Sequence, residues 1–272
     1  MAGLRLSGLE VSRDLEREYN NRARVPENPG IIASWASESA AYRQSKPPRE
    51  IRYGEGERHV FDFFEAGDGP CVMYIHGGYW QALDKSFHSI HARGLNELGV
   101  SVAVPSYDLC PNVRVGDIVR QIRSACLVLR DTVRAPLIVS GHSAGGHLAA
   151  CMLATEDYVP AAYAISGVFE LAPLIPTSLN EKLGLDAAEA ESLSPMLWPA
   201  PRGKTLDAVV GEIESGEFLR QSADMVRAWG GGGAETRYEE ITGANHFTVI
   251  APLTDPHSPM CERIKQLVDR AR

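Results

Sequence analysis

Residues 137–150 read LIVSGHSAGGHLAA and give the clearest indication of the fold. This stretch begins with an apolar run that favours a buried strand and ends in an alanine-rich run that favours a helix. Between the two lies Gly141-His142-Ser143-Ala144-Gly145, a G-x-S-x-G pattern. Such a pattern also arises by chance, but a strand before it and a helix after it are the context in which the central serine is a nucleophile. The alternative is a glycine-rich helix start with an incidental serine.

The glycines of this pattern have a physical reason. A sharp strand-to-helix turn leaves no room for side chains beside the serine, which accounts for Gly141 and Gly145. The turn lifts the Ser143 hydroxyl clear of the sheet, near a helix N-terminus where developing negative charge is favoured. We therefore expect Ser143 to be a catalytic nucleophile.

On both sides of this stretch, short apolar runs alternate with longer amphipathic segments. Strands are expected over residues 58–65, 71–75, 100–105, 137–140, 161–166, 206–210 and 236–241. Helices are expected over residues 86–98, 115–133, 144–153, 218–229 and 261–270. The alternation predicts an α/β fold with a mostly parallel, doubly wound sheet and helices on both of its faces.

Two regions interrupt this rhythm. Residues 1–50 are polar and irregular, with one helix expected near residues 12–20, and we interpret them as an N-terminal arm packed on a domain of residues 51–272. Residues 168–202 carry five prolines among short apolar pieces. An insertion of this kind over the carboxyl ends of the strands predicts a short cap.

A second glycine motif follows the strand expected at residues 71–75 and reads HGGYW over residues 76–80. Paired glycines let the backbone approach a substrate and point N–H groups into a cavity. A serine nucleophile needs such donors for the oxyanion of its tetrahedral intermediate, each contributing about 2.7–4 kcal/mol. We expect the oxyanion hole to consist of the N–H groups of Gly77, Gly78 and Ala144; a plain tight turn is the alternative.

The histidine and the acid that activate the serine are expected after the last two strands. His246 lies in a loop between the final strand and the final helix, which matches the chain order serine, acid, histidine. The loop after residues 206–210 contains no aspartate, so we assign the acid to Glu214, with Glu212 second and Asp207 expected inside the strand. A solvated acidic loop remains the alternative for each of them.

Composition excludes several other classes of function. The formal net charge is −8, which disfavours nucleic acid and anionic membrane as partners. No stretch approaches ~18 uninterrupted apolar residues, and the first 22 residues show no secretory signal. Five widely spaced cysteines predict reduced thiols in a cytoplasmic protein. No metal-binding pattern occurs, so we expect neither a metal nor a cofactor.

These motifs together resemble the arylformamidase (kynurenine formamidase) branch of the esterase/lipase-like α/β-hydrolases. The resemblance rests on residues 76–80 (HGGYW), 141–148 (GHSAGGHL), 211–218 and 245–247 (NHF), and it covers most of the chain. It implies the α/β-hydrolase fold and hydrolysis of N-formylkynurenine to kynurenine and formate without a cofactor. It also implies side activity on small aryl esters. The sequence departs from the family at Glu214, where the family has an aspartate.

The substrate is expected to be a small aromatic molecule. Tyr79, Trp80 and Phe247 adjoin the expected oxyanion loop and base, so a flat aromatic leaving group could stack on them, although simple packing explains them equally well. The alternative enzyme is a carboxylesterase acting on small acyl or carbamate esters, because it would use the same catalytic residues. The alternative outside enzymes is a small-molecule receptor with the same fold. A homodimer is possible.

Overall fold

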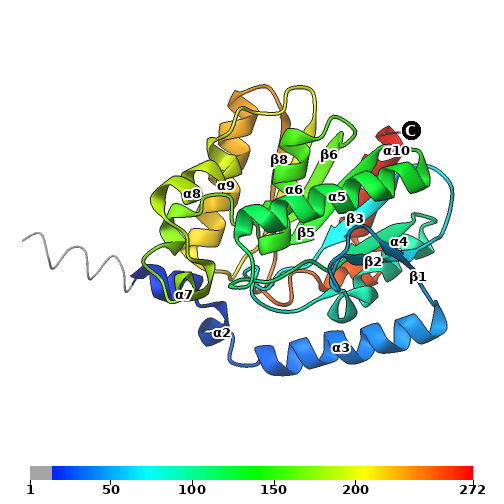
Figure 1. Cartoon of the computed structure of the whole chain (residues 1–272), viewed down its shortest axis with the longest axis horizontal. Coiled ribbons are helices and arrows are strands. Elements are labelled where there is room, and N and C mark those ends of the chain that lie inside the picture. Colours follow the sequence, from blue (N-terminus) through cyan, green and yellow to red (C-terminus); the bar gives the residue numbers. More distant parts are fainter. Residues whose placement is uncertain (1–13, 272) are drawn as a thin grey trace, which may run out of the picture.

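The computed structural model describes residues 14–271 of the chain, built around one sheet of eight strands (Figure 1). The strands are β1 (Arg49–Arg52), β2 (Val60–Phe64), β3 (Cys71–Ile75), β4 (Val102–Pro105), β5 (Leu137–His142), β6 (Ala161–Ile165), β7 (Thr205–Gly211) and β8 (Glu235–Ile241). Their order in the sheet is β1-β2-β4-β3-β5-β6-β7-β8. The β1–β2 and β2–β4 pairs are antiparallel, and all pairs from β4 to β8 are parallel. The expected mostly parallel sheet is therefore confirmed.

The longer helices are α3 (Asn28–Ser45), α5 (Val115–Val133), α6 (Ala144–Thr155), α9 (Gly216–Gly231) and α10 (Pro259–Arg270). Shorter ones are α2 (Asn21–Arg24), α4 (Arg93–Glu97), α7 (Asn180–Leu183) and α8 (Ala187–Ser192). Five single 3₁₀ turns complete the described part of the chain: η1 (Lys85–Phe87), η2 (Ser89–Ala92), η3 (Ala172–Leu174), η4 (Pro195–Leu197) and η5 (Ala251–Thr254).

Two hydrophobic clusters cover the two faces of the sheet, because successive side chains of a strand point in opposite directions. Met73 and Val139 face the cluster that contains the buried sides of α5, α6 and α9. Their neighbours Val72 and Ile138 face the cluster that contains α10 and Trp35 of α3. The central strands are buried on both faces and consist of continuous apolar runs, which is why the sequence indicated them.

The prediction of one continuous helix over residues 86–98 is wrong. The chain there forms η1, η2 and the short α4 (Figure 1). Its backbone groups are bound by α3 instead of by an uninterrupted helical ladder: the Ile90 N–H donates to Ser39 Oγ at 3.1 Å, and the Ser86 carbonyl accepts from Arg43 at 2.7 Å. These tertiary hydrogen bonds satisfy the polar groups that a continuous helix would otherwise pair.

The N-terminal region contains more regular structure than the sequence indicated. Residues 14–19 are helical, while the expected start of that helix at residues 12–13 lies outside the described part of the chain. Helix α3 and strand β1 were not expected. Pro29 is compatible with the first turn of α3. The buried residues of α3 include Asn28 and Ser39, so its apolar stripe is too broken to be recognised from periodicity.

The carboxyl ends of the parallel strands lie level with one another and position the site. Ile75 at the end of β3 is paired with Gly141 of β5, and His142 is paired with Ile165 of β6. The loops that follow these strands therefore start side by side, as is general for ligand sites in open α/β sheets. They carry the residues expected to act chemically.

Candidate active site

Ser143 stands at the turn between β5 and α6 in a backbone conformation that few non-glycine residues adopt. Its φ is +57° and its ψ is −118°, and its backbone N–H donates to the carbonyl of Ile165 at 2.8 Å. A Cβ atom on Gly141 would lie 2.2 Å from the carbonyl oxygen of Gly145, and one on Gly145 would lie 2.0 Å from that of Ile75. Both glycines are therefore required by the close packing of the turn, as the motif predicted.

The loop after β3 lies directly against this turn. A Cβ atom on Gly77 would be 3.0 Å from the Cβ of Ser143 and 2.8 Å from the carbonyl oxygen of His142. Gly78 has a φ of +106°. Within residues 14–271, the backbone N–H groups of Gly77, Gly78 and Ala144 donate to no protein acceptor, so they are free to bind a ligand. The structure thus brings the expected oxyanion donors and Ser143 into one place.

His246 follows β8 and is held by Glu214, which follows β7. The distance between His246 Nδ1 and Glu214 Oε2 is 2.6 Å, and the Glu214 side chain is fully buried. The other carboxylate oxygen, Oε1, accepts from Ser166 Oγ at 2.5 Å and from the Gly211 N–H at 2.8 Å. A carboxylate held at both oxygens fixes the orientation of the imidazole, with Nε2 as the nitrogen left to face a substrate.

The two other candidate acids lie elsewhere. Glu212 accepts a hydrogen bond from the Gly243 N–H at 2.7 Å on the surface. Asp207 is fully buried in β7, where it pairs with Arg263 at 2.6 Å. Neither is bonded to His246, so the geometry favours Glu214 among the three.

Three rings contact that of His246, namely Phe218, His142 and Phe247. The ring of Phe218 lies 4.5 Å from the ring of His246. The ring of His142, the residue before Ser143, lies 4.7 Å from that of His246. Burial lowers the pKa of His142 well below its ordinary value, and the nearby His246 adds to this effect. His142 is therefore neutral near pH 7.

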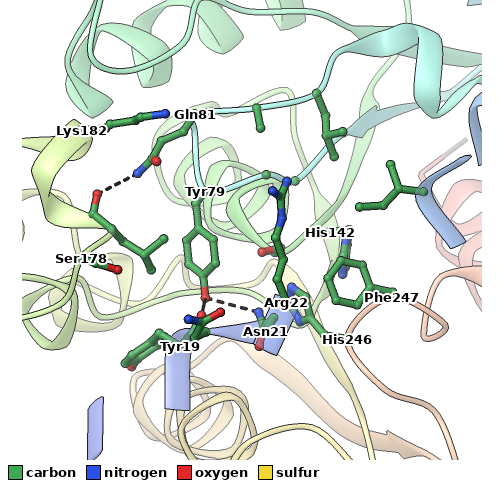
Figure 2. A pocket seen from close by; sticks show the side chains of 18 of the residues that line it. Tyr19, Asn21, Arg22, Tyr79, Gln81, His142, Ser178, Lys182, His246 and Phe247 are labelled. Carbon is green, nitrogen blue, oxygen red and sulfur yellow. Dashed lines mark hydrogen bonds between the residues drawn. The ribbon is translucent and has the colours of Figure 1, made fainter. Parts of the chain in front are cut away.

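Ser143, His246, Gly77 and Gly78 line one cavity of about 260 Å³ (Figure 2). The remaining lining residues come from the N-terminal segment, the loop after β3, the turn between β5 and α6, the insertion before β7 and the loop that carries His246. They are Glu16, Tyr19, Asn20, Asn21, Arg22, Ile32, Trp35, Tyr79, Gln81, Ala82, Leu83, His142, Ser178, Leu179, Lys182 and Phe247. Of the three aromatic residues expected to bind substrate, Tyr79 and Phe247 line the cavity.

Trp80 is a correction to the expected substrate-binding set. It is fully buried, it does not line the cavity, and its ring packs edge-on against that of His147 at 5.0 Å. The reason is local: Tyr79 and Trp80 both have positive φ angles, of +50° and +55°. The tight turn sends their side chains in different directions, Tyr79 into the cavity and Trp80 into the core.

The N-terminal contribution to the cavity was missed by sequence reasoning. The Tyr79 hydroxyl donates to the carbonyl of Tyr19 at 2.7 Å and accepts from Asn21 Nδ2 at 3.3 Å (Figure 2). Ser178 donates to Glu16 from both its backbone N–H and its hydroxyl, at 2.7 and 2.8 Å. These contacts join segments about 60 and 160 residues apart in sequence, which no local pattern indicates.

Comparisons with known proteins agree with the fold and identify the family. A family model for the α/β-hydrolase fold matches residues 72–199. The chain is 31% identical to the kynurenine formamidase of Salmo salar, over 75% of this chain and 76% of that protein. It is 32% identical to the kynurenine formamidase of Drosophila melanogaster, over 74% of each. A crystal structure from Silicibacter sp. TM1040, of a protein proposed to be a thioesterase, is 35% identical, with a TM-score of 0.83 and coverage of 93% of this chain and 99% of that one.

The fold and these relatives make the protein an enzyme of the α/β-hydrolase class. Within that class, the chain belongs to the kynurenine formamidase family. No helix among residues 14–271 is long and apolar enough to cross a membrane. In the same part of the chain, no group of three or more histidine, cysteine, aspartate or glutamate side chains is arranged to hold a metal ion.

Proposed function

We propose that the protein is a serine hydrolase that cleaves a small aryl formamide of the N-formylkynurenine type through a formyl-enzyme. The observation that carries the proposal is that one cavity is lined both by Ser143, on its strained turn, and by His246, held by the buried Glu214. The kynurenine formamidases to which the chain is similar support the choice of a formamide as substrate.

The first half of the reaction forms the acyl-enzyme. The Ser143 hydroxyl attacks the formyl carbon while His246 Nε2 takes its proton, and Glu214 stabilises the resulting imidazolium. The carbonyl oxygen becomes an oxyanion, for which the N–H groups of Gly77, Gly78 and Ala144 are the donors. The carbon–nitrogen bond then breaks, and the aryl amine leaves with the proton that His246 returns to it.

The second half regenerates the enzyme. A water molecule gives a proton to His246 and attacks the formyl ester of Ser143. The ester bond breaks, formate leaves, and the proton on His246 returns to the Ser143 oxygen. This chemistry needs neither a metal nor a cofactor.

The shape of the cavity supports an aromatic leaving group. Four aromatic side chains line it, against which a flat ring can stack: Tyr19, Trp35, Tyr79 and Phe247. Ser178, Leu179 and Lys182 line it from the insertion of residues 168–202, which we propose acts as a cap. A homodimer and a cytoplasmic location stay predictions from the sequence.

The second candidate is an esterase or thioesterase. The catalytic residues would be the same, and the relative from Silicibacter is proposed to be a thioesterase. The two candidates differ in the leaving group alone: an amine needs protonation by His246 before it departs, whereas a phenolate or thiolate leaves more readily. A small-molecule receptor is disfavoured because it needs no activated serine.

The test is a kinetic comparison of N-formylkynurenine, p-nitrophenyl acetate and a small acyl thioester with purified protein and its Ser143→Ala variant. A kcat/KM on the formamide near ~10⁴ M⁻¹s⁻¹ or above, lost in S143A, is the expected result. Turnover of the ester or thioester with negligible formamide cleavage would replace the formamide assignment by the second candidate. Activity retained in S143A, or no labelling of wild-type protein by a fluorophosphonate probe, would overturn the serine mechanism altogether.

A further inference from the structure

A cation of the N-terminal segment lines the cavity without an ion-pair partner among residues 14–271. Arg22 of α2 lines the cavity together with Ser143 and His246. Figure 2 shows its side chain extending across the pocket, between Tyr79 on one side and His142 and Phe247 on the other. Within the described part of the chain, the guanidinium of Arg22 makes no ion pair or hydrogen bond.

Neighbouring arginines of this segment behave differently. Arg24 pairs with Glu18 at 3.7 Å, and Arg17 pairs with Asp14 at 3.5 Å. Both are therefore ordinary surface ion pairs, which contribute little to stability. Arg22 is also exposed to solvent, but it lines the cavity and has no acidic partner among residues 14–271.

The backbone that carries Arg22 is fixed, so the position of its charge is defined. The buried side chain of Asn28 donates to the carbonyl of Arg22 at 3.0 Å, and the side chain of Asn20 caps α2 by accepting from the Ala23 N–H at 3.1 Å. On the other side, Asn21 is joined to Tyr79 of the oxyanion loop. The guanidinium thus starts from a backbone that is tied to the reaction centre.

We propose that Arg22 is a specificity-determining residue that binds a carboxylate on the side chain of the leaving group. The inference rests on the proposed function. A guanidinium presents parallel N–H donors that match a carboxylate, and it is easily desolvated compared with an ammonium. The chain as a whole is acidic, with a net charge of −8, so a cation at the site gives anionic substrates a local attraction against an overall negative background.

Lys182 of α7 is the other cation of the cavity lining. Figure 2 shows it beside Gln81, on the far side of Tyr79 from His246. Gln81 itself is bound to the carbonyl of Leu179 at 2.8 Å. A carboxylate bound at Lys182 would therefore lie on the opposite side of Tyr79 from His246. A carboxylate bound at Arg22 would lie on the same side as His142 and Phe247.

The experiment compares two formamides of the same shape: 4-(2-formamidophenyl)-4-oxobutanoate, which carries a carboxylate, and the corresponding neutral 4-oxobutanamide. Arg22→Gln is expected to lower the ratio of kcat/KM on the anion to kcat/KM on the neutral compound about 10- to 100-fold, the loss typical of a charge-assisted hydrogen bond. The loss should appear mainly in KM, because the carboxylate is bound equally in the ground and transition states. Arg22→Lys should recover part of the ratio, and the matched control Arg24→Gln should leave it unchanged.

Three outcomes would overturn the inference: an unchanged ratio in R22Q, an equal loss on both compounds, or a ratio that falls in Lys182→Gln instead. The same ratio is measured on 4-acetoxybenzoate and 4-acetoxybenzamide. If the wild-type protein cleaves these esters and neither formamide, the formamide assignment fails. The role of Arg22 is then decided by the ester pair alone, and an unchanged ester ratio in R22Q rejects it.

Discussion

At the scale of single residues, Glu214 shows how a short loop holds a buried carboxylate beside His246. The Glu214 N–H donates to the carbonyl of Gly211 at 3.1 Å, and the carboxylate turns back to accept from the Gly211 N–H. This tight loop brings the carboxylate of Glu214 within hydrogen-bond distance of His246. One oxygen then remains for His246 and the other for Ser166.

Glu214→Gln is therefore expected to reduce kcat by about 10³- to 10⁴-fold, because an amide cannot stabilise the imidazolium and can impose the wrong tautomer on His246. The measurement is steady-state turnover of the substrate that the wild-type protein cleaves best, with folding checked by circular dichroism. Glu212→Gln is the matched control, since Glu212 bonds to the Gly243 N–H and not to the imidazole. If E212Q lost activity and E214Q kept it, the acid would be reassigned.

A substitution of Gly77 tests whether the loop after β3 supplies donors for the oxyanion. An added methyl group would meet the carbonyl oxygen of His142 at 2.8 Å, so Gly77→Ala forces the loop away from Ser143. We expect a loss of about 10²- to 10³-fold in kcat, comparable to the loss of one oxyanion donor. Gly231→Ala is the control, because a Cβ there has nothing within 4 Å. Equal turnover in both variants would argue that Gly77 plays no part in the reaction.

Residue types and chain order were enough to predict which side chains meet at the end of the sheet. Ser143 follows a strand that an apolar run made visible, His246 follows the partly exposed final strand, and Glu214 was selected by its place after β7. The direction of side chains within a tight turn was not predictable, which is why Trp80 was assigned to the substrate and lies in the core. Arg22 was missed because its proximity to the cavity depends on how α2 packs against the loop after β3.

At the scale of elements, α3 is a helix held by a few large contacts. Trp35 is buried on its inner face, with ring distances of 5.4 Å to His88, 5.8 Å to His91 and 6.1 Å to Phe247. Because Phe247 adjoins the catalytic candidate His246, α3 supports the histidine loop from behind. Its apolar pattern is weak, so tertiary packing supplies most of what keeps it helical. This is why it could not be predicted from the sequence.

Trp35→Ala is expected to lower the free energy of unfolding by about 3–5 kcal/mol, the usual cost of deleting a large buried aromatic side chain. Turnover should fall as well, at temperatures where the variant is still folded, because Phe247 loses its support. Urea unfolding and steady-state kinetics measure the two effects. Ser37→Ala on the exposed side of α3 should change stability by no more than about 0.5 kcal/mol. A W35A protein as stable as S37A would show that α3 is not anchored through this ring.

At the scale of the whole molecule, several buried histidines make stability depend on pH, because burial keeps them uncharged in the folded state. Burial lowers the pKa of His76 to about 4, of His91 to about 3 and of His147 to about 4. The pKa of His88 is lowered well below its ordinary value by burial and by the neighbouring histidines. In the unfolded chain each of these groups titrates near 6.5. Between that pH and the lowered pKa of each histidine, the folded state therefore binds fewer protons than the unfolded state.

The stability that these groups contribute is therefore fully present above about pH 6.5 and is lost as the pH falls towards 4. His88 isolates the effect, because its ring lies among Trp35, Tyr74, His76 and His91 and neither of its nitrogens has a hydrogen-bond partner among the described residues. His88→Phe fills the same aromatic space without a titrating group. The free energy of unfolding of H88F should thus fall less steeply than that of wild type between pH 6 and 4.5, by about 1.4 kcal/mol per pH unit for the one proton removed. Carboxylates that titrate in this interval are shared by the two proteins and cancel in the difference. Urea titrations at several pH values measure both slopes. Equal slopes in H88F and wild type would mean that His88 binds the same number of protons in the folded and unfolded states.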